Sequence, residues 1–202
     1  MADAYLWTLH TLTLRQLASV DQLCEIVDQP LDDMTAALEK AVLERTVMTA
    51  RGSYMITPDG RQVLDRAYPE WFSSLRSEPA LVEAFEKFES GVNKQVLKIT
   101  TEWQTMEVDG EPVLNDHGDP DYDRKVITKL GDTYDRTVKV LDPFAIADPL
   151  VARFLARLAE ALSRAEAGEI DFVSGVRVAS FHTVWFQMHE HLLRVMGRER
   201  PE

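Results

Sequence analysis

Apolar residues recur at helical spacing along most of the chain. Leucines lie three residues apart within residues 5–17, and apolar side chains repeat at intervals of three and four in residues 32–45. The same period runs through residues 79–105, 120–141, 149–168 and 176–196. Because this period matches one face of an α-helix, the pattern predicts a mainly α chain.

Capping and breaking residues mark the helix boundaries near the N-terminus. Ser19 precedes a short amphipathic run and suits the N-cap position, where its hydroxyl accepts from a free backbone N–H. Gln29-Pro30 ends that run, because proline lacks the N–H and disfavours helical geometry in the preceding residue. Thr57-Pro58 starts a further helix as N-cap and first helical residue. These signals predict a helix after Ser19, a turn at Gln29-Pro30 and a second helix after it. A further helix is predicted to begin at Pro58.

Two stretches interrupt the helical period with short β-prone runs around a glycine turn. Residues 47–50 and 54–57 flank Arg51-Gly52-Ser53, and Asp109-Gly110 lies within residues 106–114. Such runs are typical of β-hairpins. The sequence therefore predicts a hairpin at residues 47–57 and a tight turn with a small hairpin at residues 106–114.

The order helix, turn, helix, hairpin, helix in residues 19–64 is similar to that of winged helix-turn-helix proteins. Residues 54–64 resemble the end of the wing and the following helix in MarR-like and PadR-like transcription regulators, and the resemblance covers about the first seventy residues. It implies double-stranded DNA as partner and a recognition helix at residues 32–45. The DNA contacts that it implies are Thr35, Lys40, Arg45, Arg51, Ser53 and Arg61.

The remaining helices predict a second domain. Pro69 and Pro79 bracket the connection, so we expect a winged helix at residues 1–72 and a C-terminal four-helix bundle at residues 73–202, for ligand sensing, dimerisation or both. The last helix is apolar nearly all round and must be covered at the bundle centre or at an oligomer interface. Together with the symmetry of operators read by winged-helix dimers, this predicts a homodimer.

A run of histidine and aromatic residues marks the predicted last helix. Residues 180–190 together with Asn115-Asp116-His117 resemble the C-terminal domain of a group of actinobacterial MarR-type proteins. That resemblance covers most of residues 85–200 and implies a fold without naming a ligand. We expect a small-molecule effector, where one exists, near Trp103, His117, His182, Trp185 and His189.

An acidic cluster at residues 115–123 allows two interpretations. Alternating Asp119, Asp121 and Asp123 suggest a calcium loop, but the glycine and glutamate that such a loop needs at its sixth and twelfth positions are missing. The favoured interpretation is a helix start, with Asp119 as N-cap followed by proline and first-turn carboxylates. The same Asp-Pro pair at residues 142–143 and 148–149 predicts two more helix starts. We therefore predict no metal and no cofactor.

The charge opposes the DNA-binding hypothesis. The chain of 202 residues has a net charge of −12; residues 1–72 carry six Lys and Arg against eleven Asp and Glu, and the rest is also acidic. DNA-binding domains usually carry a basic patch. A local basic edge is still compatible with DNA binding. The alternative is an acidic winged helix that serves as a protein-interaction module.

No catalytic signature stands out. The chain has no glycine-rich phosphate loop, nucleophile elbow, paired-cysteine motif or His-Glu-x-x-His motif. We therefore predict no enzyme and no catalytic residue; a weaker alternative is a metal-dependent enzyme that uses His117, His182 and His189. Residues 1–4 lack the features of a secretory signal, and no apolar run reaches membrane-spanning length, which predicts a cytoplasmic protein without a membrane partner.

Overall fold

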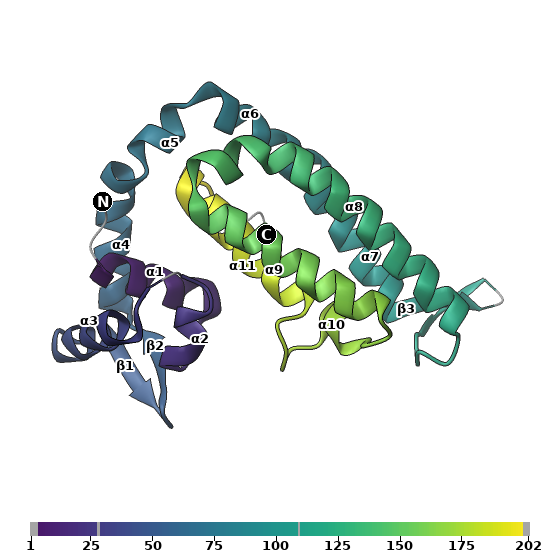
Figure 1. The fold of residues 1–202 in the computed structure, drawn as a ribbon, viewed down its shortest axis with the longest axis horizontal. Coiled ribbons are helices and arrows are strands. Elements are labelled where there is room, and N and C mark those ends of the chain that lie inside the picture. The colour runs from purple at the N-terminus through teal and green to yellow at the C-terminus, as the bar shows by residue number, and fades with distance from the viewer. Residues whose placement is uncertain (1–3, 28, 109, 200–202) are drawn as a thin grey trace. The chain divides into compact units, whose positions relative to one another are not determined.

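The computed structural model describes residues 4–27, 29–108 and 110–199, and it is mainly helical (Figure 1). This confirms the predicted mainly α class. Residues 1–3, part of the segment considered for a secretory signal, and Asp109 of the predicted turn lie outside the described residues. The chain divides into two compact units: Met1–Glu78 with Gln187–Glu202, and Pro79–Phe186.

The first unit contains a small antiparallel sheet and several helices. Its elements are α1 (Ala4–Arg15), α2 (Val20–Cys24), α3 (Leu31–Leu43), β1 (Val47–Ala50), β2 (Ser53–Ile56), α4 (Pro58–Trp71), α5 (Ser73–Ser77) and the second half of α11 (Phe181–Met196). The helices α1, α2 and α3 pack on one another, and α4 packs on α1. The core between them includes the fully buried Leu9, Leu12, Leu23, Ile26 and Leu38.

The predicted caps of the first unit are confirmed. The Ser19 hydroxyl accepts from the Gln22 backbone N–H, while the Gln22 side chain accepts from the Ser19 N–H, which makes a capping box. The Thr57 hydroxyl accepts from the Gly60 N–H at 3.2 Å. Gly60 is the residue that lets α4 approach the hairpin, because a Cβ there would lie 2.2 Å from the Thr46 carbonyl oxygen.

The first hairpin forms as predicted and is tied to the segment before α2. In the β1–β2 register Val47 faces Ile56 and Ala50 faces Ser53. Ala18 and Tyr54 exchange two backbone hydrogen bonds, of 3.1 and 2.7 Å. The hairpin is therefore bonded on one side to the chain between α1 and α2.

The division into units differs from the predicted one after residue 72 because of two contacts. Phe72 is buried and its ring lies 6.3 Å from that of His191. The Arg76 guanidinium donates to the backbone carbonyls of Val195 at 2.7 Å and Arg194 at 2.9 Å. These contacts join α5 and the second half of α11 to the first unit, although the two segments are more than a hundred residues apart in sequence.

The second unit is built from long helices. Its elements are α6 (Pro79–Lys87), the π-helix η1 (Phe88–Asn93), α7 (Lys94–Gln104), β3 (Thr105–Val108), β4 (Glu111–Leu114), α8 (Pro120–Ala147), α9 (Pro149–Glu166), α10 (Asp171–Ser174) and the first part of α11. Helix α8 packs against α6, α7 and α9, and the β3–β4 hairpin joins α7 to α8 (Figure 1). The predicted hairpin at residues 106–114 is thus present.

One predicted helix start in the second unit is wrong. Asp119 and Asp148 are N-caps, each followed by proline at the first helical position, as predicted. By contrast, α8 continues through Pro143 to Ala147 instead of restarting at Asp142-Pro143. Proline inside a helix removes a hydrogen bond. Burial of Leu141 and Phe144 on either side of it holds the helix together there.

Candidate functional site

The residues predicted to contact DNA lie on α3, the β1–β2 hairpin and α4 of the first unit. Lys40, Arg45, Arg51 and Arg61 are exposed, whereas Thr35 and Ser53 are half-buried. The Thr35 hydroxyl donates to the Leu31 carbonyl at 2.8 Å. The Lys40 ammonium lies 4.6 Å from the centre of the Tyr5 ring. Thr35 and Lys40 therefore make contacts within the unit, and the arginines are the more available groups.

Two of these arginines have an unusual backbone conformation. Arg51 and Gly52 occupy the two central positions of the hairpin turn with φ of 51° and 79°, and Arg45, just after α3, has φ of 61°. Positive φ at both central residues is the pattern of a type I′ turn, in which glycine, asparagine or aspartate is favoured over arginine. The Thr57 hydroxyl donates to the Arg45 carbonyl at 2.8 Å and so holds this segment.

The exposed side of α3 is acidic and apolar. Asp32, Asp33 and Glu39 are exposed on it, and the Leu43 side chain is 85% exposed at its end. The carboxylates of the first turn stabilise the helix N-terminus through its dipole. They also repel phosphate, so the positive charge near α3 comes from Lys40, from Arg45 and Arg51 at the hairpin and its flank, and from Arg61 on α4.

In the second unit three of the predicted ligand-binding residues lie close together. The rings of Trp103 and His117 are 4.4 Å apart between centroids. Trp103 and His182 both line a cavity of about 10 Å³, which is at the lower limit of the space that can hold one water molecule. Burial lowers the pKa of His182 below its ordinary value. A larger ligand at this place requires the helices to open.

The other two predicted ligand residues have different surroundings. Trp185 is buried, its indole N–H donates to the Asn93 side-chain oxygen at 3.0 Å, and its ring stacks on those of Phe88 and Phe181. His189 is also buried, but it belongs to the part of α11 assigned to the first unit. Trp185 thus has a clear packing role in the core of the second unit.

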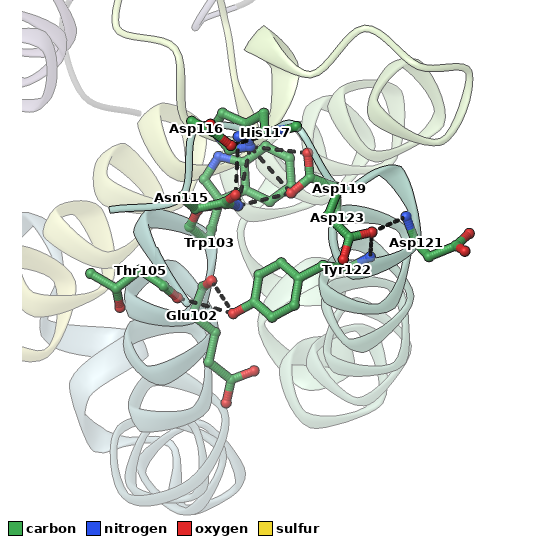
Figure 2. Close-up of polar contacts among 11 residues, drawn as sticks. Glu102, Trp103, Thr105, Asn115, Asp116, His117, Asp119, Asp121, Tyr122 and Asp123 are labelled. Atoms are coloured by element: carbon green, nitrogen blue, oxygen red, sulfur yellow. Dashed lines mark hydrogen bonds and ion pairs between the residues drawn. The ribbon is translucent and has the colours of Figure 1, made fainter. Parts of the chain in front are cut away.

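A polar network occupies the predicted acidic cluster (Figure 2). The Asn115 amide nitrogen donates to Asp123 Oδ1 at 2.8 Å and to the Trp103 carbonyl at 3.1 Å. His117 Nδ1 lies 3.0 Å from Asp123 Oδ2, and His117 itself has φ of 60°. The sequence prediction did not include Asn115 and Asp123 among the site residues; the alternation of asparagine, histidine and aspartate was the available signal.

A tyrosine completes the link between α8 and the end of α7. The Tyr122 hydroxyl lies within hydrogen-bond distance of the carbonyl oxygens of Glu102, at 2.8 Å, and Thr105, at 3.0 Å (Figure 2). With Asn115, side chains from the loop and from α8 thus satisfy carbonyls at the C-terminal end of α7. The acidic cluster therefore joins two helices, and its Asp123 carboxylate is already paired within the chain.

A buried histidine cluster in the first unit was not predicted. His10 is fully buried, with Nδ1 2.9 Å from the Tyr68 hydroxyl and Nε2 2.9 Å from His191 Nδ1. Burial, and then the electrostatic effects of His191 and Arg194, hold the pKa of His10 well below its ordinary value. Burial raises the pKa of Tyr68. The sequence places His10 and His191 on separate helices and contains no signal that they meet.

Neither metal binding, nor membrane insertion, nor similarity to known proteins assigns a role to the sites described above. Within residues 4–27, 29–108 and 110–199 no group of three or more His, Cys, Asp or Glu side chains is arranged to hold a metal. Every helix described there is too short or too polar to cross a bilayer. The comparisons with known proteins find no matching family model, no similar curated protein and no similar solved structure.

Proposed function

We propose that the chain is a DNA-binding transcription regulator of MarR-like type. In this proposal α1 to α4 and the β1–β2 hairpin form a winged helix-turn-helix domain, with α3 as the recognition helix and the hairpin as the wing. The order of these elements supports it, as do the hydrogen bonds between Ala18 and Tyr54 that tie the wing to the segment before α2. The helices of the second unit then form the four-helix bundle that senses a small molecule.

The observation that carries the proposal is the placement of arginine on left-handed backbone at Arg45 and Arg51. A non-glycine residue in this conformation costs about 1–2 kcal/mol. Neither arginine makes an ion pair within the described part of the chain. At Arg51, in the hairpin turn, a guanidinium kept at such a cost, exposed and unpaired, points to a partner outside the chain, and DNA phosphate is the partner that a wing tip contacts.

The acidic exposed side of α3 limits how this domain engages DNA. Asp32 and Asp33 stand where a recognition helix usually meets the duplex. We therefore propose that phosphate contacts by Arg45, Arg51 and Arg61 supply most of the affinity. With about three phosphate contacts in each protomer, log K falls with log salt with a slope of about −3 per protomer.

A salt titration tests this proposal. Fluorescence anisotropy with duplexes from the protein's own promoter region should detect binding at low salt. The binding constant should then fall as salt is added, with a slope of log K against log salt of about −3 per protomer. Arg51→Ala should weaken binding to all sequences and reduce the slope by about one unit for each protomer. Lys125→Ala, at an exposed position on α8, is the matched control and should leave the DNA affinity and the salt slope unchanged. Absence of binding by the folded protein at low salt would reject the proposal.

The homodimer remains part of the proposal. Most side chains of α11 are buried within the single chain, so this helix no longer calls for a partner to cover it. The argument that is left is that winged-helix regulators read two half-sites as symmetric dimers. Sedimentation at micromolar concentration should give a species of about twice the 23.0 kDa chain mass. A 23.0 kDa species alone, with and without DNA, would contradict the dimer.

A second candidate function is a protein-interaction module. It is favoured by the exposed side of α3, where acidic residues stand beside Leu31 and Leu43, which are 53% and 85% exposed. Apolar side chains ringed by carboxylates suit a basic protein surface better than DNA. Leu43→Ser separates the two functions, because it should abolish binding to such a protein and leave a salt-dependent interaction with DNA in place.

A further inference from the structure

A groove on the second unit gathers positive charge that the composition does not predict. It has a volume of about 670 Å³ and lies where η1 and the start of α7 face α8. Its lining residues are Lys87, Gly91, Val92, Lys94, Gln95, Lys98, Arg136, Lys139 and Val140. Five of the nine are cations and none is acidic, on a chain with a net charge of −12.

The cations of the groove are exposed, and part of their charge is uncompensated. Lys87 pairs with Glu83 at 2.7 Å, and Lys98 lies 3.9 Å from Glu102; each glutamate is one helical turn from its lysine. Lys94 and Lys139 make no ion pair among the described residues. Clustered charges of one sign around a concave surface focus the field and raise the local concentration of anions.

The floor of the groove is apolar. Val92 is 5% exposed and Val140 is half-buried, and the aliphatic stems of the lysines add to this surface. Gly91 lies in the π-helix η1, a type of segment frequent at functional sites. A Cβ added to Gly91 would meet no atom within 4 Å, so the glycine borders open space.

The inner side of the same π-helix is fixed by the core. Asn93 is buried and its side-chain oxygen accepts from the Trp185 indole N–H at 3.0 Å. Phe88, at the start of η1, is fully buried and stacks on Trp185 at 5.3 Å. The wide turn is therefore held in place from inside while Gly91 and Lys94 line the groove, which makes the groove a built feature of the fold.

We propose that this groove binds a small organic anion, in which a carboxylate or phosphate monoester is joined to an apolar acyl or aryl body. The charged end lies against Lys94 and Lys139, and the body lies along Val92, Gly91 and Val140. A volume of about 670 Å³ falls in the range of small-molecule sites and greatly exceeds a single inorganic phosphate. This inference goes beyond the proposed function, since it holds whether or not the first unit binds DNA.

Calorimetry with the full chain tests the ligand class. Dodecanoate and dodecyl phosphate, each below its micellar concentration, are the probes, and dodecanol and sodium phosphate are the controls. We expect both anionic amphiphiles to bind at least tenfold more tightly than dodecanol or phosphate. Dodecanol binding as tightly as dodecanoate would overturn the role of the cations, and phosphate alone binding as tightly would overturn the role of the apolar floor.

Three variants locate the site. Lys94→Glu with Lys139→Glu should weaken dodecanoate binding at least tenfold, whereas Lys125→Glu with Arg177→Glu, an equal change of charge at exposed positions off the groove, should change it less than twofold. Gly91→Phe keeps every charge and should also weaken binding at least tenfold by filling the groove. Equal effects of the two charge pairs, or unchanged binding by Gly91→Phe in folded protein, would overturn the proposal. Displacement of dodecanoate by a short random-sequence duplex would do so as well, because it would identify a nucleic-acid surface.

Discussion

The two compact units hold their polar side chains in different ways. In the first unit Arg45 and Arg51 stand on left-handed backbone, and the buried cluster joins His10 to a tyrosine and a second histidine. In the second unit the groove cations stand on helices, and a partly buried network pairs His117 with Asp123. The left-handed arginines of the first unit cost stability, whereas the His117–Asp123 contact of the second unit adds to it. Replacing Arg51 in the first unit and Asp123 in the second should therefore change stability in opposite directions.

The largest expected change in stability follows from removal of the buried Asp123 carboxylate in the second unit. Asp123→Ala removes the acceptor of Asn115 and the partner of His117, and should lower the free energy of unfolding of this unit by about 3 kcal/mol. Asp121→Ala, on the same helical turn but exposed, should cost less than about 0.5 kcal/mol. A protein that keeps Trp103 and Trp185 but has phenylalanine at positions 7 and 71 reports on the second unit by fluorescence during urea unfolding. If Asp121→Ala lowered the free energy of unfolding as much as Asp123→Ala, the buried Asp123 carboxylate would not be a specific source of stability in the second unit.

Acid should weaken the first unit through His10. Its pKa is held well below the ordinary 6.5 by burial, so the unfolded chain takes up a proton near pH 6.5 while the folded chain does not. Stability is full above about pH 6.5 and is lost progressively as pH falls below it. Hydrogen exchange of peptides within residues 4–27 measures this loss locally.

Two variants assign that pH dependence. His10→Gln keeps side-chain groups that can bond Tyr68 and His191, and should flatten the dependence below pH 6.5 even where it lowers stability at pH 7. His182→Gln is the control in the second unit, where the pKa of a half-buried histidine is also lowered, and it should leave exchange in residues 4–27 unchanged. Retention of the full pH dependence by His10→Gln would rule out this histidine as its source.

Local signals allowed much of the fold to be predicted. Caps at Ser19, Thr57, Asp119 and Asp148 and the two hairpins were readable because each depends on a few adjacent residues. The helix through Pro143 was not, because tertiary burial overrides the local preference against proline. The end of the first unit was also not predictable, since Arg76 finds its carbonyl acceptors more than a hundred residues later.

The candidate sites were less predictable than the fold. Which cations share a surface depends on how helices pack, and the five groove cations are spread over residues 87–139. Overall charge gave no indication of them, since an acidic sum conceals a local cluster of the opposite sign. Likewise no sequence pattern connects His10 with its partner His191, which lies on another helix. The backbone strain at Arg51 is recognised only from its φ angle, which a sequence pattern does not give.

The smallest expected effect is also the one that separates stability from function in the first unit. Arg51→Asn places in the hairpin turn a residue that favours positive φ, and should raise the free energy of unfolding by about 1 kcal/mol while it weakens DNA binding. Gln16→Asn is the matched control, because Gln16 is exposed with φ of 68° and lies just after α1. It should give a similar gain in stability and leave DNA affinity unchanged. Thermal unfolding of the two variants measures the gain in stability, and fluorescence anisotropy of the same proteins measures their DNA affinity. If Arg51→Asn gains stability and DNA affinity is unaffected, the strained arginine has no phosphate partner, and the exposed acidic and apolar side of α3 becomes the better guide to what this unit binds.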